Sequence, residues 1–286
     1  MISIIIPAFN EEESIAQTIK DVHSTLKILK IPDYEVLVVN DGSIDKTKQE
    51  AEKSNATVIS NPQNSGYGFS LKKGIEKAKY ETIIITDADG TYPFNEVPNL
   101  YKEFSKGFDM VVGQRTGENF RESLMKSSLR SLLKFVVEFA AGKRIPDINS
   151  GMRIFKKKTI KEYFPQLCET FSFTTSATLA YMMNGKFVSF IPIGYKKRKG
   201  KSKVNLFKDS FRTILYILQS VSYYNPLKIF ILFAATCIIL SFIGFMASLF
   251  FGLTSGFYLG IGGLLVSLII ISIGLLADIL KQILNK

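Results

Sequence analysis

Tryptophan is absent from the 286-residue sequence, and histidine and cysteine are nearly so, with one and two residues respectively. Two cysteines, Cys168 and Cys237, are too few for a disulfide scaffold or for a zinc site of several cysteines. The single histidine, His23, excludes a histidine-rich metal centre. Hydrophobic residues make up 47% of the chain, which excludes a disordered protein. The length fits one large domain or two small ones, at about 100–200 residues per domain.

Charged residues are missing from one long stretch, because residues 229–277 contain no Asp, Glu, Lys or Arg. A helix needs about 20 apolar residues to cross about 30 Å of lipid hydrocarbon, so this stretch is long enough for two crossings. The sequence Gly-Leu-Thr-Ser-Gly at 252–256 interrupts it with residues typical of a turn. We therefore predict a transmembrane hairpin of two helices, about 227–251 and 257–277, joined by a short outer loop. The alternative is a buried hairpin of a soluble protein, but such helices seldom run past about 20 residues without a polar face.

Basic residues gather immediately before this hairpin. Between residues 191 and 212 the chain carries eight Lys or Arg side chains and one acidic side chain, a net +7 out of the +11 of the whole sequence. Positive flanks stay on the cytoplasmic side, which predicts that the preceding domain and both termini are cytosolic. A positive cluster beside a membrane also attracts anionic headgroups. Nucleic-acid binding is the other interpretation of this charge, but no recognition motif accompanies it, and we expect no nucleic-acid partner.

Apolar runs and helical periodicities alternate along the first 200 residues. The expected strands are 3–7, 34–39, 57–60, 82–86, 110–112 and 187–193, and the expected helices are 11–29, 46–54, 68–79 and 123–141. Strands that alternate with helices indicate βαβ units and a mostly parallel sheet. Residues 205–224 carry an apolar stripe beside basic residues, which predicts a helix in the membrane interface or else an ordinary domain helix. The expected domains are an α/β domain at 1–204, an interfacial segment at 205–226 and the hairpin with a short tail at 227–286.

Polar clusters follow three of these strands, with Asn-Glu at 10–11, Asn-Asp at 40–41 and Asp-Ala-Asp at 87–89. Ligands of parallel α/β sheets bind beyond the carboxyl ends of the strands, so this shared edge is the predicted site. Two carboxylates one residue apart, Asp87 and Asp89, suit one Mg²⁺ ion, which takes one or two carboxylates and completes its shell with substrate phosphates. Such a cation neutralises the charge that develops on a diphosphate leaving group.

Two glycine-containing motifs give weaker signals. Gly-Tyr-Gly at 66–68 resembles the start of a dinucleotide fingerprint, but Leu71 occupies the position of the third glycine. Gly-Lys-Ser at 200–202 resembles the end of a P-loop, but Tyr195 replaces the upstream glycine that a P-loop requires. These departures argue against a nicotinamide dehydrogenase and against a P-loop nucleotidase.

Several motifs, taken together and in order, resemble glycosyltransferase family 2. They are Pro-Ala-Phe-Asn-Glu-Glu at 7–12, Asn-Asp-Gly-Ser-Ile-Asp at 40–45 and Asp-Ala-Asp-Gly-Thr-Tyr-Pro at 87–93. Three later blocks, at 149–153, 171–175 and 198–203, resemble the polyprenyl-phosphate hexosyltransferases, the branch similar to dolichol-phosphate mannose synthase. The resemblance implies a GT-A fold, which is a Rossmann-like α/β domain whose mostly parallel sheet has helices on both faces.

The resemblance also implies a reaction. A nucleotide-diphosphate sugar, either a UDP- or a GDP-sugar, would give its hexose to a polyprenyl monophosphate such as undecaprenyl or dolichyl phosphate, with inversion at the anomeric carbon. The cofactor would be Mg²⁺ or Mn²⁺, and the partners would be the nucleotide-sugar donor, the polyprenyl-phosphate acceptor and the lipid bilayer. The enzyme would be integral to the cytoplasmic membrane, or to the endoplasmic reticulum of a eukaryote, and the sequence leaves a homo-oligomer open.

Roles for individual residues follow from the same resemblance. Five residues would line the nucleotide base and ribose: Pro7, Phe9, Glu11, Val39 and Asp41. Asp87 and Ala88 would lie at the ribose and diphosphate, and Asp89, together with Asp87, would hold the metal ion. Three basic residues would face phosphates of the donor or acceptor: Arg115, Arg198 and Lys203. Many relatives carry Leu-Gln after the second Asp, whereas this chain has Gly90 and Thr91, so Thr91 or water would replace a metal-binding amide.

Other candidates come from the residues themselves. Lys126 and Arg130 are four positions apart on one helix face and would bind the lipid phosphate at its entrance, or else form a solvated face. Asp147 would orient a cation or act as a weak base, or else be an ordinary turn carboxylate. A phosphate acceptor is already anionic at pH 7, so positioning and charge stabilisation are needed rather than a strong base. The predicted catalytic set is Asp87, Asp89, Arg115 and Asp147.

Two other functions stay open at this point. A processive polysaccharide synthase of the same superfamily would share the fold, but such enzymes use a Gln-x-x-Arg-Trp block and this chain has no Trp. A non-catalytic membrane adaptor would also keep the fold, although the intact carboxylates argue against it.

Overall fold

Seven short runs of mostly apolar residues pair into one sheet, in the order β3-β2-β1-β4-β6-β5-β7. The strands are β1 (Ile2–Ala8), β2 (Tyr34–Asn40), β3 (Thr57–Ser60), β4 (Thr82–Ile85), β5 (Met110–Thr116), β6 (Arg153–Lys156) and β7 (Val188–Gly194). All neighbouring strands are parallel except β6, which runs antiparallel to both β4 and β5. The mostly parallel α/β sheet is therefore confirmed, and the antiparallel β6 is a feature that the sequence did not reveal.

The structure is a computed structural model that describes residues 1–117, 135, 137–139, 141–196, 215, 218–219 and 221–284. Contacts within the chain divide it into two compact units. The first comprises Met1–Phe135 and Arg144–Tyr216, and the second comprises Val136–Lys143 and Ile217–Lys286. The expected helix at 123–141 and the expected interfacial helix at 205–224 lie largely outside the described residues.

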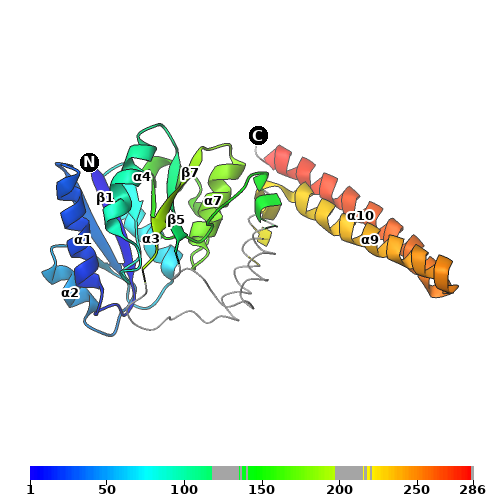
Figure 1. Cartoon of the computed structure of the whole chain (residues 1–286), viewed down its shortest axis with the longest axis horizontal. Coiled ribbons are helices and arrows are strands. Elements are labelled where there is room, and N and C mark those ends of the chain that lie inside the picture. The colour runs from blue at the N-terminus through cyan, green and yellow to red at the C-terminus, as the bar shows by residue number, and fades with distance from the viewer. Residues whose placement is uncertain are drawn as a thin grey trace. The chain divides into compact units, whose positions relative to one another are not determined.

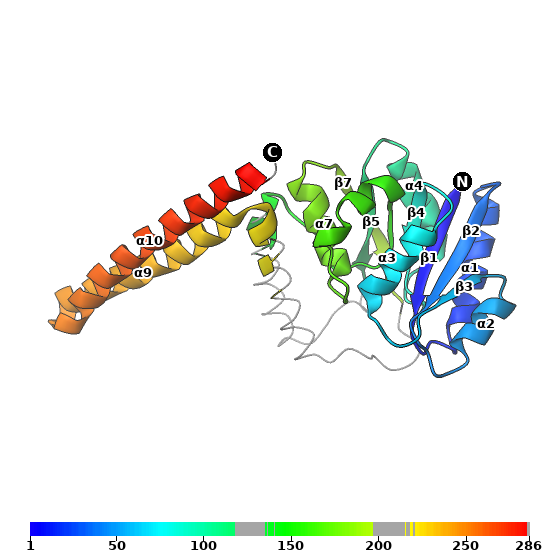
Figure 2. The same ribbon diagram turned by 180° about the vertical axis from the view of Figure 1, so that it is seen from behind.

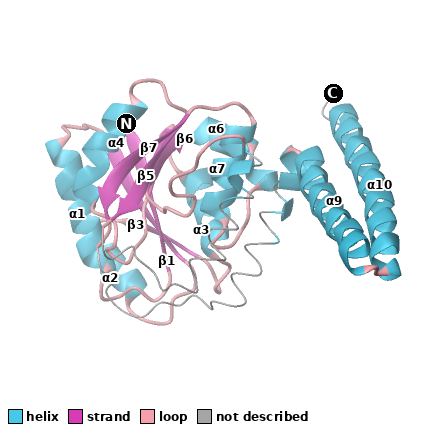
Figure 3. Cartoon of the chain, turned by 45° about the vertical axis from the view of Figure 1, so that its right-hand side comes forward, coloured by secondary structure: helices cyan, strands magenta, loops and turns pink. Residues whose placement is uncertain are grey.

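Helices cover both faces of the sheet in the first unit (Figure 3). One face carries α1 (Ile15–Ile28), α2 (Thr47–Lys53) and α4 (Val97–Phe104), and the other carries α3 (Tyr67–Lys77), α6 (Lys157–Glu162) and α7 (Phe173–Met183). The short 3₁₀ helices η1 (Phe94–Glu96) and η3 (Phe164–Gln166) join these elements.

The central strand β1 shows why its sequence is an unbroken apolar run. Ile4 and Ile6 belong to the core cluster with α1, whereas Ile5 lies against Gly74 of α3 on the opposite face. Because both faces are buried, no polar residue alternates with the apolar ones. The helix α7 is almost entirely buried for the same reason, and it therefore lacks the amphipathic periodicity by which a helix is recognised in a sequence.

Two long apolar helices form the core of the second unit and lie side by side (Figures 1 and 2). They are α9 (Pro226–Phe251) and α10 (Thr254–Leu284), and both are long and apolar enough to cross a membrane. Gly252 ends α9 with φ +65°, the left-handed conformation that favours glycine. The connection is shorter than predicted, and α10 continues beyond residue 277 through Asp278 and Lys281, because charged residues do not break a helix.

Glycines allow the two long helices to approach closely. A Cβ atom at Gly256 would lie 2.6 Å from the carbonyl oxygen of Gly244, and one at Gly244 would lie 2.8 Å from the carbonyl oxygen of Gly256. The hydroxyl of Ser241 donates a hydrogen bond to the carbonyl oxygen of Gly260. Contacts of small residues are the usual means by which helices associate in lipid, where the hydrophobic effect does not drive them together.

We expect Gly256→Leu to force α9 and α10 apart, at a cost of about 1–3 kcal/mol for overpacking. The measurement is the melting temperature of the purified full chain in detergent micelles. The matched control is Gly262→Leu, on the same helix, since no atom lies within 4 Å of a Cβ at Gly262. Equal melting temperatures of the two variants would contradict the packing described here.

Candidate active site

Polar residues gather where β1, β2 and β4 end, at the carboxyl edge of the sheet. These three strands are parallel neighbours, with β1 between the other two. Their ends therefore bring Glu11, Asp41, Asp87 and Asp89 to a single edge, as the sequence predicted. Pro7 and Val39 are register partners in β1 and β2, and both are buried.

The carboxylate of Asp41 organises the loop that follows β3. Its Oδ1 accepts hydrogen bonds from Asn61 Nδ2 at 2.7 Å and from the Ser65 backbone N–H at 2.9 Å. Its Oδ2 accepts a hydrogen bond from the Gly66 backbone N–H at 2.9 Å. Asp41 is only 4% exposed, so any contact that it makes to a ligand shares its oxygens with this loop.

A single dipeptide connects Asp41 to Asp87. Gly66 donates its N–H to Asp41, and the hydroxyl of the next residue, Tyr67, donates to Asp87 Oδ1 at 2.8 Å. The two carboxylates therefore lie at one site, although β1 separates the strands that carry them. Burial, and then the negative charge of Asp87, raise the pKa of Tyr67 well above its ordinary value, so the phenol keeps its proton.

The carboxylate of Asp87 lies against the backbone of Gly151. A Cβ atom at position 151 would be 2.6 Å from Asp87 Oδ1 and 2.8 Å from Oδ2, so only glycine fits. The Gly151 N–H donates to the hydroxyl of Tyr92 at 2.7 Å. Asp87 is thus enclosed by side-chain and backbone groups from two distant parts of the sequence.

Asp89 is 7% exposed and is held by Thr91. The backbone N–H and the hydroxyl of Thr91 donate to Asp89 Oδ1 at 3.1 and 2.6 Å. Ala88 is buried between the two acids, and its carbonyl oxygen accepts from the hydroxyl of Thr18 at 3.1 Å. Thr91 therefore contacts Asp89, and its replacement of a metal-binding amide stays a prediction.

Oxygen atoms are the only ligand type that Asp87, Asp89 and Thr91 offer, and this is the donor set that Mg²⁺ and Mn²⁺ prefer. Across the described parts of the chain, no three His, Cys, Asp or Glu side chains group as a ready-made metal site. Mg²⁺ typically binds proteins through one or two carboxylates and takes its other ligands from phosphates and water. The residues present fit that mode of binding.

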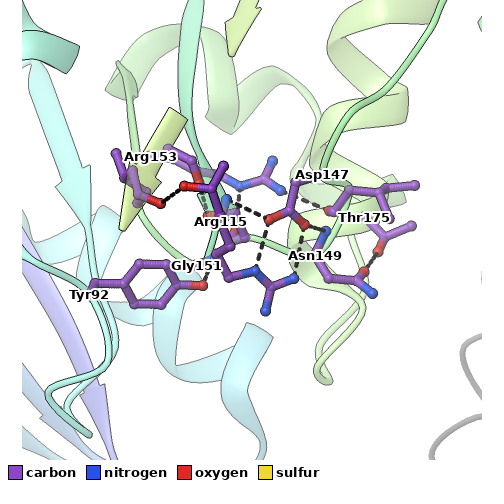
Figure 4. A network of polar contacts seen from close by, with 12 residues as sticks. Tyr92, Arg115, Asp147, Asn149, Gly151, Arg153 and Thr175 are labelled. Atoms are coloured by element: carbon purple, nitrogen blue, oxygen red, sulfur yellow. Dashed lines mark hydrogen bonds and ion pairs between the residues drawn. The ribbon is translucent and has the colours of Figure 1, made fainter. Parts of the chain in front are cut away.

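Arg115 and Asp147 form a two-pronged ion pair (Figure 4). Arg115 Nε donates to Asp147 Oδ2 at 2.8 Å, and Nη2 donates to Oδ1 at 2.9 Å. The backbone N–H of Arg115 also donates to Oδ2, and the N–H of Asn149 donates to Oδ1. Burial by itself would raise the pKa of Asp147, but the hydrogen bonds and charge of Arg115 hold it below the ordinary value. Asp147 therefore holds the Arg115 guanidinium in one orientation, and its role toward a bound cation or as a weak base stays a prediction.

Arg153 is a residue whose role the sequence analysis missed. It is fully buried, and its guanidinium donates to the carbonyl oxygens of Ser150 and Ile148 and to the hydroxyl of Thr178. Burial lowers the pKa of Arg153 to about 10, which still leaves it charged at pH 7. These bonds shape the loop that presents Asp147 on one side and Gly151 on the other (Figure 4).

The end of β7 also reaches the site. The Tyr195 ring packs edge-on against Tyr92, with centroids 5.4 Å apart, and the Arg115 guanidinium lies 5.4 Å from the Tyr195 centroid. The backbone N–H of Lys196 donates to the carbonyl oxygen of Thr91 at 2.9 Å. This bond holds the backbone of Lys196 beside Thr91, which is two positions after Asp89 in the sequence.

The two glycines of the Gly-Tyr-Gly motif at 66–68 pack against a neighbouring stretch of backbone. A Cβ at Gly66 would lie 2.7 Å from the carbonyl oxygen of Glu169, and a Cβ at Gly68 would lie 2.3 Å from that of Cys168. The glycines are needed because these two stretches of backbone touch. This explains why the motif is present without the rest of a dinucleotide fingerprint.

Four predicted site residues lie outside the described residues. They are Lys126, Arg130, Arg198 and Lys203. Their roles stay predictions. Phe9 and Glu11 are partly exposed at the end of β1, and the Glu11 backbone N–H donates to the Thr47 hydroxyl at 2.8 Å.

Comparison with known proteins identifies related enzymes. A model of the family described as glycosyl transferase family 2 matches residues 3–164. The low-salt glycan biosynthesis hexosyltransferase Agl6 of Haloferax volcanii is 30% identical over 281 residues, covering 93% of this chain and 65% of that protein. An undecaprenyl-phosphate 4-deoxy-4-formamido-L-arabinose transferase of Pseudomonas fluorescens is 32% identical over 166 residues, covering 56% of this chain and 48% of that protein. The chain thus spans about half to two thirds of the length of these two relatives.

Another relative is matched over most of its length. The dolichyl-phosphate hexose transferase of Haloferax volcanii is 25% identical over 209 residues, which cover 72% of this chain and 87% of that protein. Among solved structures, glucosyl-3-phosphoglycerate synthase of Mycobacterium tuberculosis, in complex with Mn²⁺, UDP and glucosyl-3-phosphoglycerate, has a TM-score of 0.63. The match covers 77% of this chain and 80% of that one at 20% identity, and it shows the fold.

We expect Asp147→Asn to lower the free energy of unfolding at pH 7 by roughly 3 kcal/mol, because it leaves the Arg115 charge buried without its partner. The folded-state pKa of Asp147 is lowered, so the wild type begins to lose this stabilisation as the pH falls below about 4, the ordinary pKa of Asp, and the loss is complete only below the lowered pKa of the folded state. The variant should lack that part of the acid sensitivity. Thermal unfolding at pH 7 and at pH 3.5 measures both effects.

The control for this experiment is Asp33→Asn, which changes an exposed carboxyl just before β2. It should unfold like the wild type at both pH values. If Asp147→Asn also did so, the ion pair would not contribute to stability as described.

Proposed function

Since the chain belongs to glycosyltransferase family 2, we propose that it transfers a hexose from a UDP- or GDP-sugar to a polyprenyl monophosphate, such as undecaprenyl or dolichyl phosphate, with inversion at the anomeric carbon. The observation that carries this proposal is the joining of Asp41 and Asp87 at one edge of the sheet, in a chain that also has two membrane-length helices. Relatives named for undecaprenyl phosphate and dolichyl phosphate support the choice of acceptor.

Asp89 and Asp87 would hold Mg²⁺ or Mn²⁺ in this proposal, with Thr91 steadying Asp89. When bound, the ion neutralises the negative charge that develops on the nucleoside diphosphate as it leaves. Structures of glucosyl-3-phosphoglycerate synthase with Mn²⁺ and UDP support this assignment. Pro7, Phe9, Glu11, Val39, Asp41 and Ala88 are the residues proposed around the nucleoside.

Arg115 is proposed to bind a phosphate of the donor or the acceptor. A guanidinium suits this role because it is always charged and carries five N–H donors, two of which bond to Asp147. These two bonds fix the plane of the guanidinium. Because the acceptor phosphate is already anionic at pH 7, the reaction needs this positioning and no strong base.

The basic segment after Lys196 supplies further phosphate ligands in this proposal. The backbone bond between Lys196 and Thr91 supports this proposal, since Arg198 and Lys203 follow Lys196 in the sequence. Lys126 and Arg130 are proposed to bind the phosphate of the lipid acceptor. A polyprenyl phosphate is anchored in the bilayer by its isoprenoid tail. Basic residues that bind its phosphate would therefore be needed close to the membrane.

The membrane arrangement is part of the same proposal. The α/β domain at 1–204 and both termini would be cytosolic, residues 205–226 would lie in the interface, and α9 and α10 would cross the bilayer. The density of basic residues before α9 supports this orientation.

The test is to incubate membranes containing the full chain with a panel of radiolabelled UDP- and GDP-sugars and then to extract labelled lipid. We expect label in polyprenyl-phosphate hexose for at least one donor, only with Mg²⁺ or Mn²⁺ present. Asp89→Ala should abolish the labelling while the protein still folds and inserts, and Asp33→Ala should not change it.

Other outcomes of this assay would contradict the proposal. Metal-dependent transfer that survived in Asp89→Ala would rule out the metal assignment. A polymer in place of labelled lipid would favour a polysaccharide synthase. Failure to bind any nucleotide-sugar with Mg²⁺ or Mn²⁺ would favour a membrane adaptor.

Arg198→Ala is expected to raise the KM for the lipid phosphate by roughly 10- to 100-fold, because a hydrogen bond to a charged group contributes about 1.5–3 kcal/mol. Lys203→Ala should act in the same direction. The measurement is initial transfer rate against the concentration of the polyprenyl phosphate in detergent. Lys27→Ala, which removes an exposed charge from α1, is the control. Unaltered kinetics toward both donor and acceptor would overturn the assignment of these two residues.

A further inference from the structure

We infer that Tyr67 is a positioning residue that holds the Asp87 carboxylate and joins it to Asp41, so that the two carboxylates act as one unit toward a nucleoside diphosphate. The inference rests on the proposed function for the identity of the ligand. Tyr67 lies outside the motifs that carry the resemblance to glycosyltransferase family 2.

Tyr67 lies between two strand ends. Asp41 follows β2 and Asp87 follows β4, and these strands do not pair with each other because β1 lies between them. The Gly66 N–H bonds to Asp41 Oδ2 at 2.9 Å, and the Tyr67 hydroxyl bonds to Asp87 Oδ1 at 2.8 Å. A shift of the Gly66 backbone away from Asp41 would therefore also move the phenol away from Asp87.

The backbone of Tyr67 is fixed by contacts of the glycines before and after it. Gly66 has φ +109°, a conformation that side-chain-bearing residues rarely adopt. Gly66 and Gly68 touch the carbonyl groups of Glu169 and Cys168, and the Phe69 N–H donates to the Glu169 carbonyl oxygen at 2.9 Å. The glycines on either side of Tyr67 thus allow this turn to pack closely against the segment before α7.

The ring of Tyr67 stacks on the ring of Phe171, with centroids 5.9 Å apart and an angle of 15° between the planes. An offset stack of this kind restricts the rotation of both rings. Phe171 belongs to the same segment as Glu169, so backbone and ring are held by one neighbouring stretch of chain.

The far side of Asp87 is closed by Gly151, where a Cβ would lie 2.6 Å from Oδ1. The carboxylate therefore lies between the Tyr67 hydroxyl and a backbone surface, and its plane is set before any ligand arrives. Preorganised groups stabilise developing charge because no reorganisation is needed during the reaction. Loss of the hydroxyl should let the carboxylate rotate and should weaken binding of the donor, but not of the lipid acceptor.

The experiment compares Tyr67→Phe with Tyr34→Phe in the full chain. Both changes remove one phenol hydroxyl that makes a hydrogen bond, since Tyr34 contacts His23 Nδ1 at 2.9 Å where β2 begins, at the other edge of the sheet. Calorimetric titration of UDP and of GDP, each with Mn²⁺, should give a Kd raised roughly tenfold in Tyr67→Phe and unchanged in Tyr34→Phe. In the transfer assay the KM for the lipid should stay within twofold of the wild type.

Several outcomes would overturn the inference. An unchanged nucleotide Kd in Tyr67→Phe would remove the positioning role, while the wild type would still transfer hexose and the proposed function would stand. A rise in the donor Kd and the lipid KM together, with a lower melting temperature, would indicate a merely structural residue. If the wild type bound neither UDP nor GDP with Mn²⁺ or Mg²⁺, the proposed function itself would fail, and this inference with it.

The coupling to Asp41 has its own test. Asp41→Asn, Tyr67→Phe and the double variant form a double-mutant cycle for nucleotide affinity. If the two residues act as one unit, the double variant should lose little more than the worse single variant. Additive losses would contradict the coupling, and if Asp41→Asn did not fold, the result for Tyr67→Phe alone would decide the role of Tyr67.

Discussion

Close approach of backbone to carboxylate is the constraint on which the site depends. Asp87 can lie where it does only because position 151 has no Cβ, and Tyr67 can reach it only because Gly66 and Gly68 let their turn touch the segment at 168–169. These contacts join parts of the chain that are far apart in sequence. The glycines are therefore as necessary for the fixed positions of the acidic side chains as the acidic residues themselves.

The basic residue of the site, Arg115, is held by an ion pair. Arg115 and Asp147 are both largely buried, and a buried ion pair is retained only when its geometry is good and its remaining bonds are satisfied. Two backbone N–H groups complete the bonds of Asp147, and Arg153 shapes the loop that carries it. The arrangement stabilises a single orientation of the Arg115 guanidinium.

Strand positions and the edge of the candidate site were largely predictable. A buried parallel strand is an unbroken apolar run, as in β1, and the polar residues that follow such strands must meet at one edge. The antiparallel direction of β6 was not predictable, because a four-residue strand carries no signal of its partner's direction. The helix α7 was missed because it is buried all round, and the roles of Tyr67 and Arg153 were missed because neither belongs to an acidic motif.

The sequence by itself determined the α/β class, the two membrane-length helices and the carboxylates at the ends of the strands, since each of these depends on the local order of apolar and charged residues. Only the tertiary structure decided that Asp147 is paired with Arg115, and that Tyr67 connects Asp41 with Asp87. These contacts join residues 20 or more positions apart, and local patterns hold no information about which distant side chain a hydrogen bond will reach. The candidate functional side chains could be identified from the sequence, whereas their hydrogen-bond partners depend on how the sheet and its loops pack.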